Sequence, residues 1–198
     1  MRGLTRGILI GGMILLAAGC SSKKDPTKAN FKEAINSYYS AHPECVWTSP
    51  VKFPVEADPS KEGQTAGLDA LTDAGLLTRT SEQKKVFIFG SKQINSYDLS
   101  DRGRSAWTPD QQQPGSGNFC FGHRDVTTVD NFTTSGDQQG ATIANVDYHF
   151  TISDIASWAR STEMKTAFPT IQADIAGAQI DKATLVLTGN DGWQVSKD

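Results

Sequence analysis

The chain has 198 residues, of which 37% are hydrophobic and 21% charged, enough for one sizeable domain or two small ones that share a core. It carries 19 basic and 22 acidic side chains, a net charge of −3. Because binding to nucleic acid depends on neutralising phosphates, this slightly acidic balance excludes a nucleic-acid partner from our expectations.

The N-terminus has the layout of an export signal. Arg2 and Arg6 are its only charged residues, and residues 7–18 carry no charge. This run is shorter than the roughly 20 residues that a helix needs to span a bilayer. It fits the roughly 7–15 apolar residues of a secretory signal peptide. We therefore expect residues 1–19 to be a signal peptide.

Small residues stand directly before a cysteine in the sequence Leu16-Ala17-Ala18-Gly19-Cys20. This motif resembles the lipobox of bacterial lipoprotein precursors, although the family most often has leucine where this chain has Ala17. The resemblance implies cleavage after Gly19 and a thioether-linked diacylglycerol on Cys20. Two or three acyl chains attach a protein lastingly, at about 0.8 kcal/mol per buried methylene. An ordinary signal peptide or a buried N-terminal helix is the alternative.

The residues after the cysteine bear on where the protein is delivered. The residue after Cys20 is Ser21 and not aspartate. In bacteria with two membranes, this resembles the usual pattern of lipoproteins that are released to the outer membrane. The resemblance thus implies a lipid-anchored protein of the cell envelope that faces the periplasm, at the outer membrane in preference to the inner one. Residues 20–30 are expected to be the lipidated cysteine and a flexible tether, because the stretch after Cys20 is polar and unpatterned. The expected partners are the bilayer, through acylated Cys20, and an envelope protein.

Two further cysteines, Cys45 and Cys120, form an even pair in an oxidising compartment, which predicts a disulfide between them. A metal site or a catalytic thiol is the alternative. The sequence contains no C-x-x-C, and its three histidines lack the spacing of metal ligands. We therefore expect neither a metal nor a cofactor.

The first half of the body, residues 31–108, is predicted to be mainly helical with one β-hairpin. Apolar spacing, caps and turn residues predict the following elements in chain order: a helix over 26–41, a short edge strand over 51–55, a helix over 63–74, hairpin arms over 84–89 and 93–99, and a helix over 101–107. Residues 109–118, rich in Gln, Pro and Gly, are expected to link this half to the next.

Part of this half, residues 61–107, resembles a winged-helix domain. The resemblance rests on the helical leucines Leu68 and Leu71, the following Gly75-Leu76-Leu77, and the hairpin after them. Winged-helix proteins that bind DNA place basic and amide side chains on this helix. Here the same segment holds three acidic residues and a single lysine. The resemblance therefore implies a fold and not a DNA-binding function.

The second half, residues 119–198, is predicted to be a four-stranded antiparallel sheet with one covered side. Residues 141–152 alternate apolar and polar side chains, which is typical of a half-buried strand. Met164, Phe168, Ile171 and Ile175 form an apolar stripe that is expected to cover the sheet. The predicted fold class is thus α+β, a winged-helix-like half with a hairpin, joined to a four-stranded sheet backed by one or two helices.

No catalytic motif stands out. The chain has no G-x-S-x-G, no phosphate-binding glycine loop and no H-E-x-x-H. The nearest polar cluster is His123 with Asp125, joined in one arrangement by Asp147 and His149 on a neighbouring strand. We therefore favour a noncatalytic binding or assembly module that uses the groove between the halves or the solvent-exposed face of the sheet. A small envelope hydrolase using His123 and Asp125 is the alternative.

Overall fold

The computed structural model describes residues 22–86, 90–136, 141–189 and 191–196. Strands make up 46% of the structure and helices 27%, so the fold is mostly β. Its strands form two antiparallel sheets, one of seven strands and one of three. The predicted class, a winged-helix-like half joined to a four-stranded sheet, is therefore wrong.

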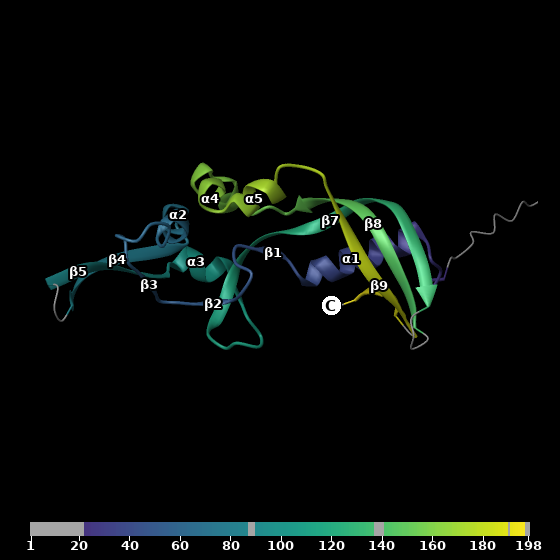
Figure 1. The fold of residues 1–198 in the computed structure, drawn as a ribbon, viewed down its shortest axis with the longest axis horizontal. Helices are drawn as coiled ribbons and strands as arrows, with labels where there is room; N and C mark the ends of the chain where they lie inside the picture. Colours follow the sequence, from purple (N-terminus) through teal and green to yellow (C-terminus); the bar gives the residue numbers. More distant parts are fainter. Residues whose placement is uncertain (1–21, 87–89, 137–140, 190, 197–198) are drawn as a thin grey trace, which may run out of the picture.

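The seven-stranded sheet curls around the first helix, α1 (Lys28–Ala41) (Figure 1). Its main path runs in the order β1-β7-β8-β9-β10, and two short strands, β2 and β6, pair with β7. The strands are β1 (Glu44–Cys45), β2 (Val51–Lys52), β6 (Trp107–Pro109), β7 (Ser116–Gly136), β8 (Thr142–Ser153), β9 (Gln179–Thr188) and β10 (Gly192–Val195).

Helix α1 supplies the cover of this sheet. It begins at Lys28 because the Thr27 hydroxyl caps it, accepting the backbone N–H of Asn30. Its two fully buried residues, Phe31 and Ile35, pack into the curl of the sheet. Although α1 falls largely in the first half of the sequence, it belongs to the core of the second.

The three-stranded sheet has the order β3-β5-β4. It comprises β3 (Val55–Ala57), β4 (Leu77–Val86) and β5 (Gly90–Leu99), with α2 (Ala66–Asp73) and α3 (Asp101–Ala106) beside it. Beyond the pairing of Ala57 with Asn95, β4 and β5 continue as a two-stranded hairpin whose side chains over 82–85 and 90–93 are exposed. Residues 87–89, predicted as part of one arm, lie outside the described residues.

The late helices pack on α2 and on the start of β7, and not on the part of the large sheet that surrounds α1. After a 3₁₀ turn (Ser157–Arg160), α4 (Thr162–Ala167) and α5 (Pro169–Asp174) follow as two separate helices. Their buried residues Met164 and Ile171 share a core with Leu71 of α2. The expectation that this stripe backs the four-stranded sheet is therefore wrong, because α1 already occupies that face.

Strand β7 is the reason that the two cores do not follow the two halves of the sequence. It is 21 residues long and enters both cores. Phe119 and Phe121 lie in the core beneath α2, whereas Val126 and Val129 lie in the core around α1. Residues 109–118, expected to be a linker between halves, include the turn of a hairpin in which β6 pairs with the start of β7.

The N-terminal segment 22–27 lies against the body. The indole N–H of Trp193 in β10 contacts the carbonyl oxygens of Lys24 and Asp25, each at 3.2 Å. The Asn30 side-chain amide donates to the carbonyls of Ser22 and Asp25 at 2.9 and 2.8 Å. The described part of the expected tether is thus docked, and Cys20 lies outside the described residues. In the described ranges, no helix has the length and apolarity to cross a membrane.

The molecule is elongated. Helix α1 begins at one end of the long axis, and the β4–β5 hairpin projects from the other (Figure 1). The junction of the two cores, where β1, the start of β7 and α5 meet, lies between these ends. The fold therefore separates the docked N-terminal segment from the exposed hairpin by the whole length of the body.

Candidate functional site

A groove of about 780 Å³ lies at the junction of the two cores. Strand β1 and the loop after it form one wall, the β6–β7 hairpin a second, and α5 a third. Its lining is more apolar than polar and includes Trp47, Pro50, Pro109, Asn118, Thr170 and Asp174. A concave site with an apolar lining and a few polar groups is typical of a binding site.

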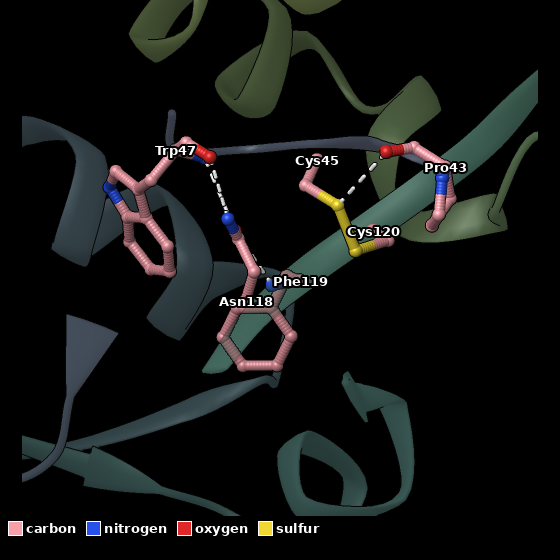
Figure 2. Close-up of a disulfide and its surroundings, with 6 residues drawn as sticks. All are labelled: Pro43, Cys45, Trp47, Asn118, Phe119 and Cys120. Carbon is pink, nitrogen blue, oxygen red and sulfur yellow. Dashed lines mark hydrogen bonds between the residues drawn. A yellow bond between two sulfur atoms is a disulfide. The ribbon is translucent and has the colours of Figure 1, made fainter. Parts of the chain in front are cut away.

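The β1 wall is fixed to β7 by covalent and hydrogen bonds (Figure 2). Cys45 and Cys120, the two cysteines expected to pair, face each other across the strands and are joined by a disulfide. The backbone N–H of Val46 donates to the Phe119 carbonyl at 2.9 Å. Bonds within the chain therefore fix this wall.

Asn118 fixes the next residue along the same wall. Its side-chain amide donates to the Trp47 carbonyl at 2.6 Å, and its side-chain oxygen accepts the Trp47 backbone N–H at 3.2 Å. Figure 2 shows this amide facing the Trp47 backbone beside the disulfide. One side chain thereby satisfies both backbone groups of Trp47, as a neighbouring strand would. Trp47 is held at the groove as a result, and its indole packs beside the rings of Phe53, Phe119 and Phe168.

Arg124 closes one end of the groove. Its Nε donates to Glu44 Oε1 and its Nη1 to Asp181 Oδ2, both at 2.5 Å. The guanidinium lies between the rings of Tyr39 and Phe150, 4.6 and 4.5 Å from their centroids. These contacts join α1, β1, β7, β8 and β9 around one cation through its Nε and Nη1 donors and two aromatic rings.

At this end of the groove, acidic side chains outnumber basic ones. Glu44, Asp174 and Arg124 all line the groove. Burial raises the pKa of Asp174, and the negative charge of Glu44 raises it further, whereas Arg124 only partly offsets both. Because Arg124 is already shared between Glu44 and Asp181, the groove is suited to a ligand with a cationic or hydrogen-bond-donating group.

The histidines predicted as a polar cluster are not brought together. His123 pairs with Ser153 on β8, four residues from His149 on the same strand. At about 3.3 Å per residue, this offset places the two positions roughly 13 Å apart along the sheet. His149 instead lies with its Nε2 2.9 Å from an Asp130 carboxylate oxygen.

The two predicted acidic partners have other neighbours. Asp125 accepts a hydrogen bond from the Asn36 side chain of α1 at 3.3 Å, and Asp147 forms an ion pair with Lys182 at 3.0 Å. In the described part of the chain, no group of three or more His, Cys, Asp or Glu side chains could hold a metal ion. The described structure thus offers no combined acid–base site from these four residues.

Sequence reasoning missed Arg124, although a signal for it was present. The residue stands between His123 and Asp125, and alternation along the strand turns it to the opposite face, the same one as the buried Val126. A charged side chain on the inward face of a strand needs partners. The partners themselves, Glu44 and Asp181, are 80 and 57 residues away in sequence, and no local pattern identifies them.

Comparisons with protein families, with curated proteins and with solved structures found no match to this chain.

Proposed function

We propose that the protein is an envelope lipoprotein, anchored through acylated Cys20, and that it serves as a noncatalytic binding or assembly module. The sequence of residues 1–20 supports the anchor, because it resembles a lipoprotein precursor. The observation that carries the binding role is the groove, whose β1 wall is fixed by the Cys45–Cys120 disulfide and by Asn118. A wall that is ordered before binding reduces the entropy lost when a partner binds.

The partner that best fits the groove is a segment of an envelope protein with apolar side chains and a basic residue. Trp47, Pro50 and Pro109 provide the apolar surface along its length. Glu44 and Asp174 provide the acidic end, where a lysine or arginine of the partner would relieve the repulsion between the two carboxylates.

Binding is favoured over hydrolysis because the polar side chains near the groove and on the sheet already contact one another. Arg124 is bonded to two carboxylates, and His149 lies against Asp130. A hydrolase needs a nucleophile, a base and an orienting group within hydrogen-bond reach of one another. His123 on β7 and His149 on β8 are offset by four residues along the sheet, too far apart to act on the same bond.

Site-specific photocrosslinking in native membranes tests the binding role. A photoreactive residue at Thr170, an exposed groove residue of α5, is expected to give a discrete crosslinked adduct. The matched control is Gln172, which is exposed on the same helix and does not line the groove. An adduct from Thr170 that a Trp47→Ala substitution abolishes supports the proposal. Equal labelling from both positions, or none from either, contradicts it.

A further inference from the structure

The docked N-terminal segment limits how far the body can stand from its anchor. Trp193 and Asn30 hold the carbonyls of Ser22, Lys24 and Asp25 against the body. The Asp25 carboxylate closes the turn by accepting the backbone N–H of Ser22 at 2.9 Å. Fixed structure therefore reaches to within two residues of the proposed lipid attachment point.

Only Ser21 separates Cys20 from this docked segment. Two peptide units span at most about 7 Å when fully extended. Acyl chains on Cys20 would therefore enter the bilayer beside Ser22, and this end of the body would meet the lipid headgroups. A free tether of ten residues would instead allow an average separation of roughly 18 Å and any orientation.

The side chains at this end include several lysines. Lys23, Lys24 and Lys28 are exposed around the docked turn and the first turn of α1, and the Lys28 ammonium also donates to the Asp130 carbonyl at 2.7 Å. Glu33 lies 3.9 Å from Lys23 and partly offsets it, while the Asp25 carboxylate is directed to the Ser22 backbone. The body without residues 1–19 has 17 basic and 22 acidic groups, so its net charge is negative and anionic lipid repels the body as a whole. Lysines gathered at one end favour the approach of that end.

We propose that residues 22–28 form a membrane-contact face, in which the docked turn fixes the orientation of the body and Lys23, Lys24 and Lys28 lie at the lipid phosphates. This inference rests on the proposed anchoring through Cys20. In this orientation the β4–β5 hairpin is the part of the body farthest from the bilayer (Figure 1). The groove is then held clear of the headgroups and open to an envelope partner.

The orientation is measured with the acylated protein in phosphatidylethanolamine–phosphatidylglycerol vesicles that carry a nickel-chelating lipid as a quencher. A fluorophore is attached through a genetically encoded azide at Thr133 or at Lys85. Thr133 is exposed beside Phe132, whose ring packs on Phe31 in the first turn of α1, and Lys85 is exposed on the hairpin. We expect the Thr133 fluorophore to be quenched several-fold more strongly than the Lys85 fluorophore.

A second variant separates docking from mere attachment. Ten Gly/Ser residues inserted between Ser21 and Ser22 keep the anchor and the fold but allow the body to leave the headgroups. We expect this insertion to reduce the difference in quenching between the two positions. Equal quenching at both positions in the acylated parent, or a difference unchanged by the insertion, overturns the membrane-contact face and leaves the anchor intact. Purified protein without acyl chains overturns the proposed anchoring itself, and this inference with it.

Discussion

The Asn118 side chain forms hydrogen bonds with both the carbonyl and the N–H of Trp47, 71 residues away. It thereby continues the pairing between β1 and β7 past the end of β1, with a side chain in place of a strand backbone. The same Asn118 oxygen also accepts the backbone N–H of Phe119 at 3.0 Å. The position of the Trp47 backbone in this wall therefore depends on a single amide next to the disulfide. We expect its loss to affect both stability and binding.

Asn118→Ala removes both bonds and leaves the half-buried backbone of Trp47 without these partners. The expected cost is about 1–3 kcal/mol in the free energy of unfolding, measured by urea denaturation. Asn131→Ala, on the exposed part of the same strand, is the matched control and should change stability by less than about 0.5 kcal/mol. Similar losses from the two variants would contradict the role given to Asn118.

Arg124→Met keeps an unbranched stem but removes the guanidinium, and so leaves Glu44 and Asp181 without their shared cation. Removing one partner of a fully buried ion pair costs about 3–5 kcal/mol. We expect about 2–3 kcal/mol here, because all three groups keep partial contact with solvent. Arg160→Met, at an exposed position, should be neutral in the same denaturation experiment. A neutral Arg124→Met would show that the cation does not hold the junction together.

The local elements of this fold could be predicted from the sequence more closely than its architecture. The alternation over 141–152 and the apolar spacing over 26–41 correspond to β8 and α1 within two residues at each end. Both signals depend only on neighbouring residues, whose spacing reports which face of an element is buried. The sequence also predicts the hairpin of β4 and β5, although β4 begins seven residues and β5 three residues earlier than predicted; β5 ends at Leu99, as predicted.

Which helix covers which sheet could not be predicted. Elements next to each other in sequence usually pack together, so α4 and α5 were assigned to the sheet formed by β7 and β8. The single strand β7 passes through both cores, and α1 fills the curl that those helices were expected to cover. The ion pairs of Arg124 could not be predicted for a similar reason, because they join segments that are distant in sequence.

Reduction of the Cys45–Cys120 disulfide should lower stability substantially. The bond closes a loop with a sequence separation of 75 residues. In the chain-entropy model, a cross-link of this span stabilises by about 4 kcal/mol relative to the reduced chain. Calorimetry of the parent and of the Cys45→Ser/Cys120→Ser double variant measures the difference. A midpoint unchanged by the double substitution would mean that the hydrogen bonds alone fix the wall.

The raised pKa of Asp174 makes the stability of the folded protein depend on pH, and the sign of this dependence follows from the direction of the shift. Its pKa is raised in the folded protein by burial and by the charge of Glu44, so the folded state holds this proton more tightly than the unfolded state does. Its contribution to stability is therefore present below the unfolded pKa of about 3.9 and is lost as the pH rises through the folded pKa.

We expect Asp174→Asn to raise the melting temperature at pH 7 and to have no such effect near pH 3. The exposed Asp73→Asn, whose residue lies outside the groove, serves as the control. A destabilised Asp174→Asn at pH 7 would mean that the carboxylate makes a net favourable contact in the folded state.

The central claim is that the protein is anchored by lipid and carries a groove whose wall is fixed by the Cys45–Cys120 disulfide. The intact mass of the protein extracted from membranes tests this claim most directly. The account predicts a chain that begins at Cys20, carries the added mass of a diacylglycerol with or without a third acyl chain, and lacks two hydrogens through the Cys45–Cys120 bond. A chain that retains residues 1–19 with all three thiols unmodified would contradict it.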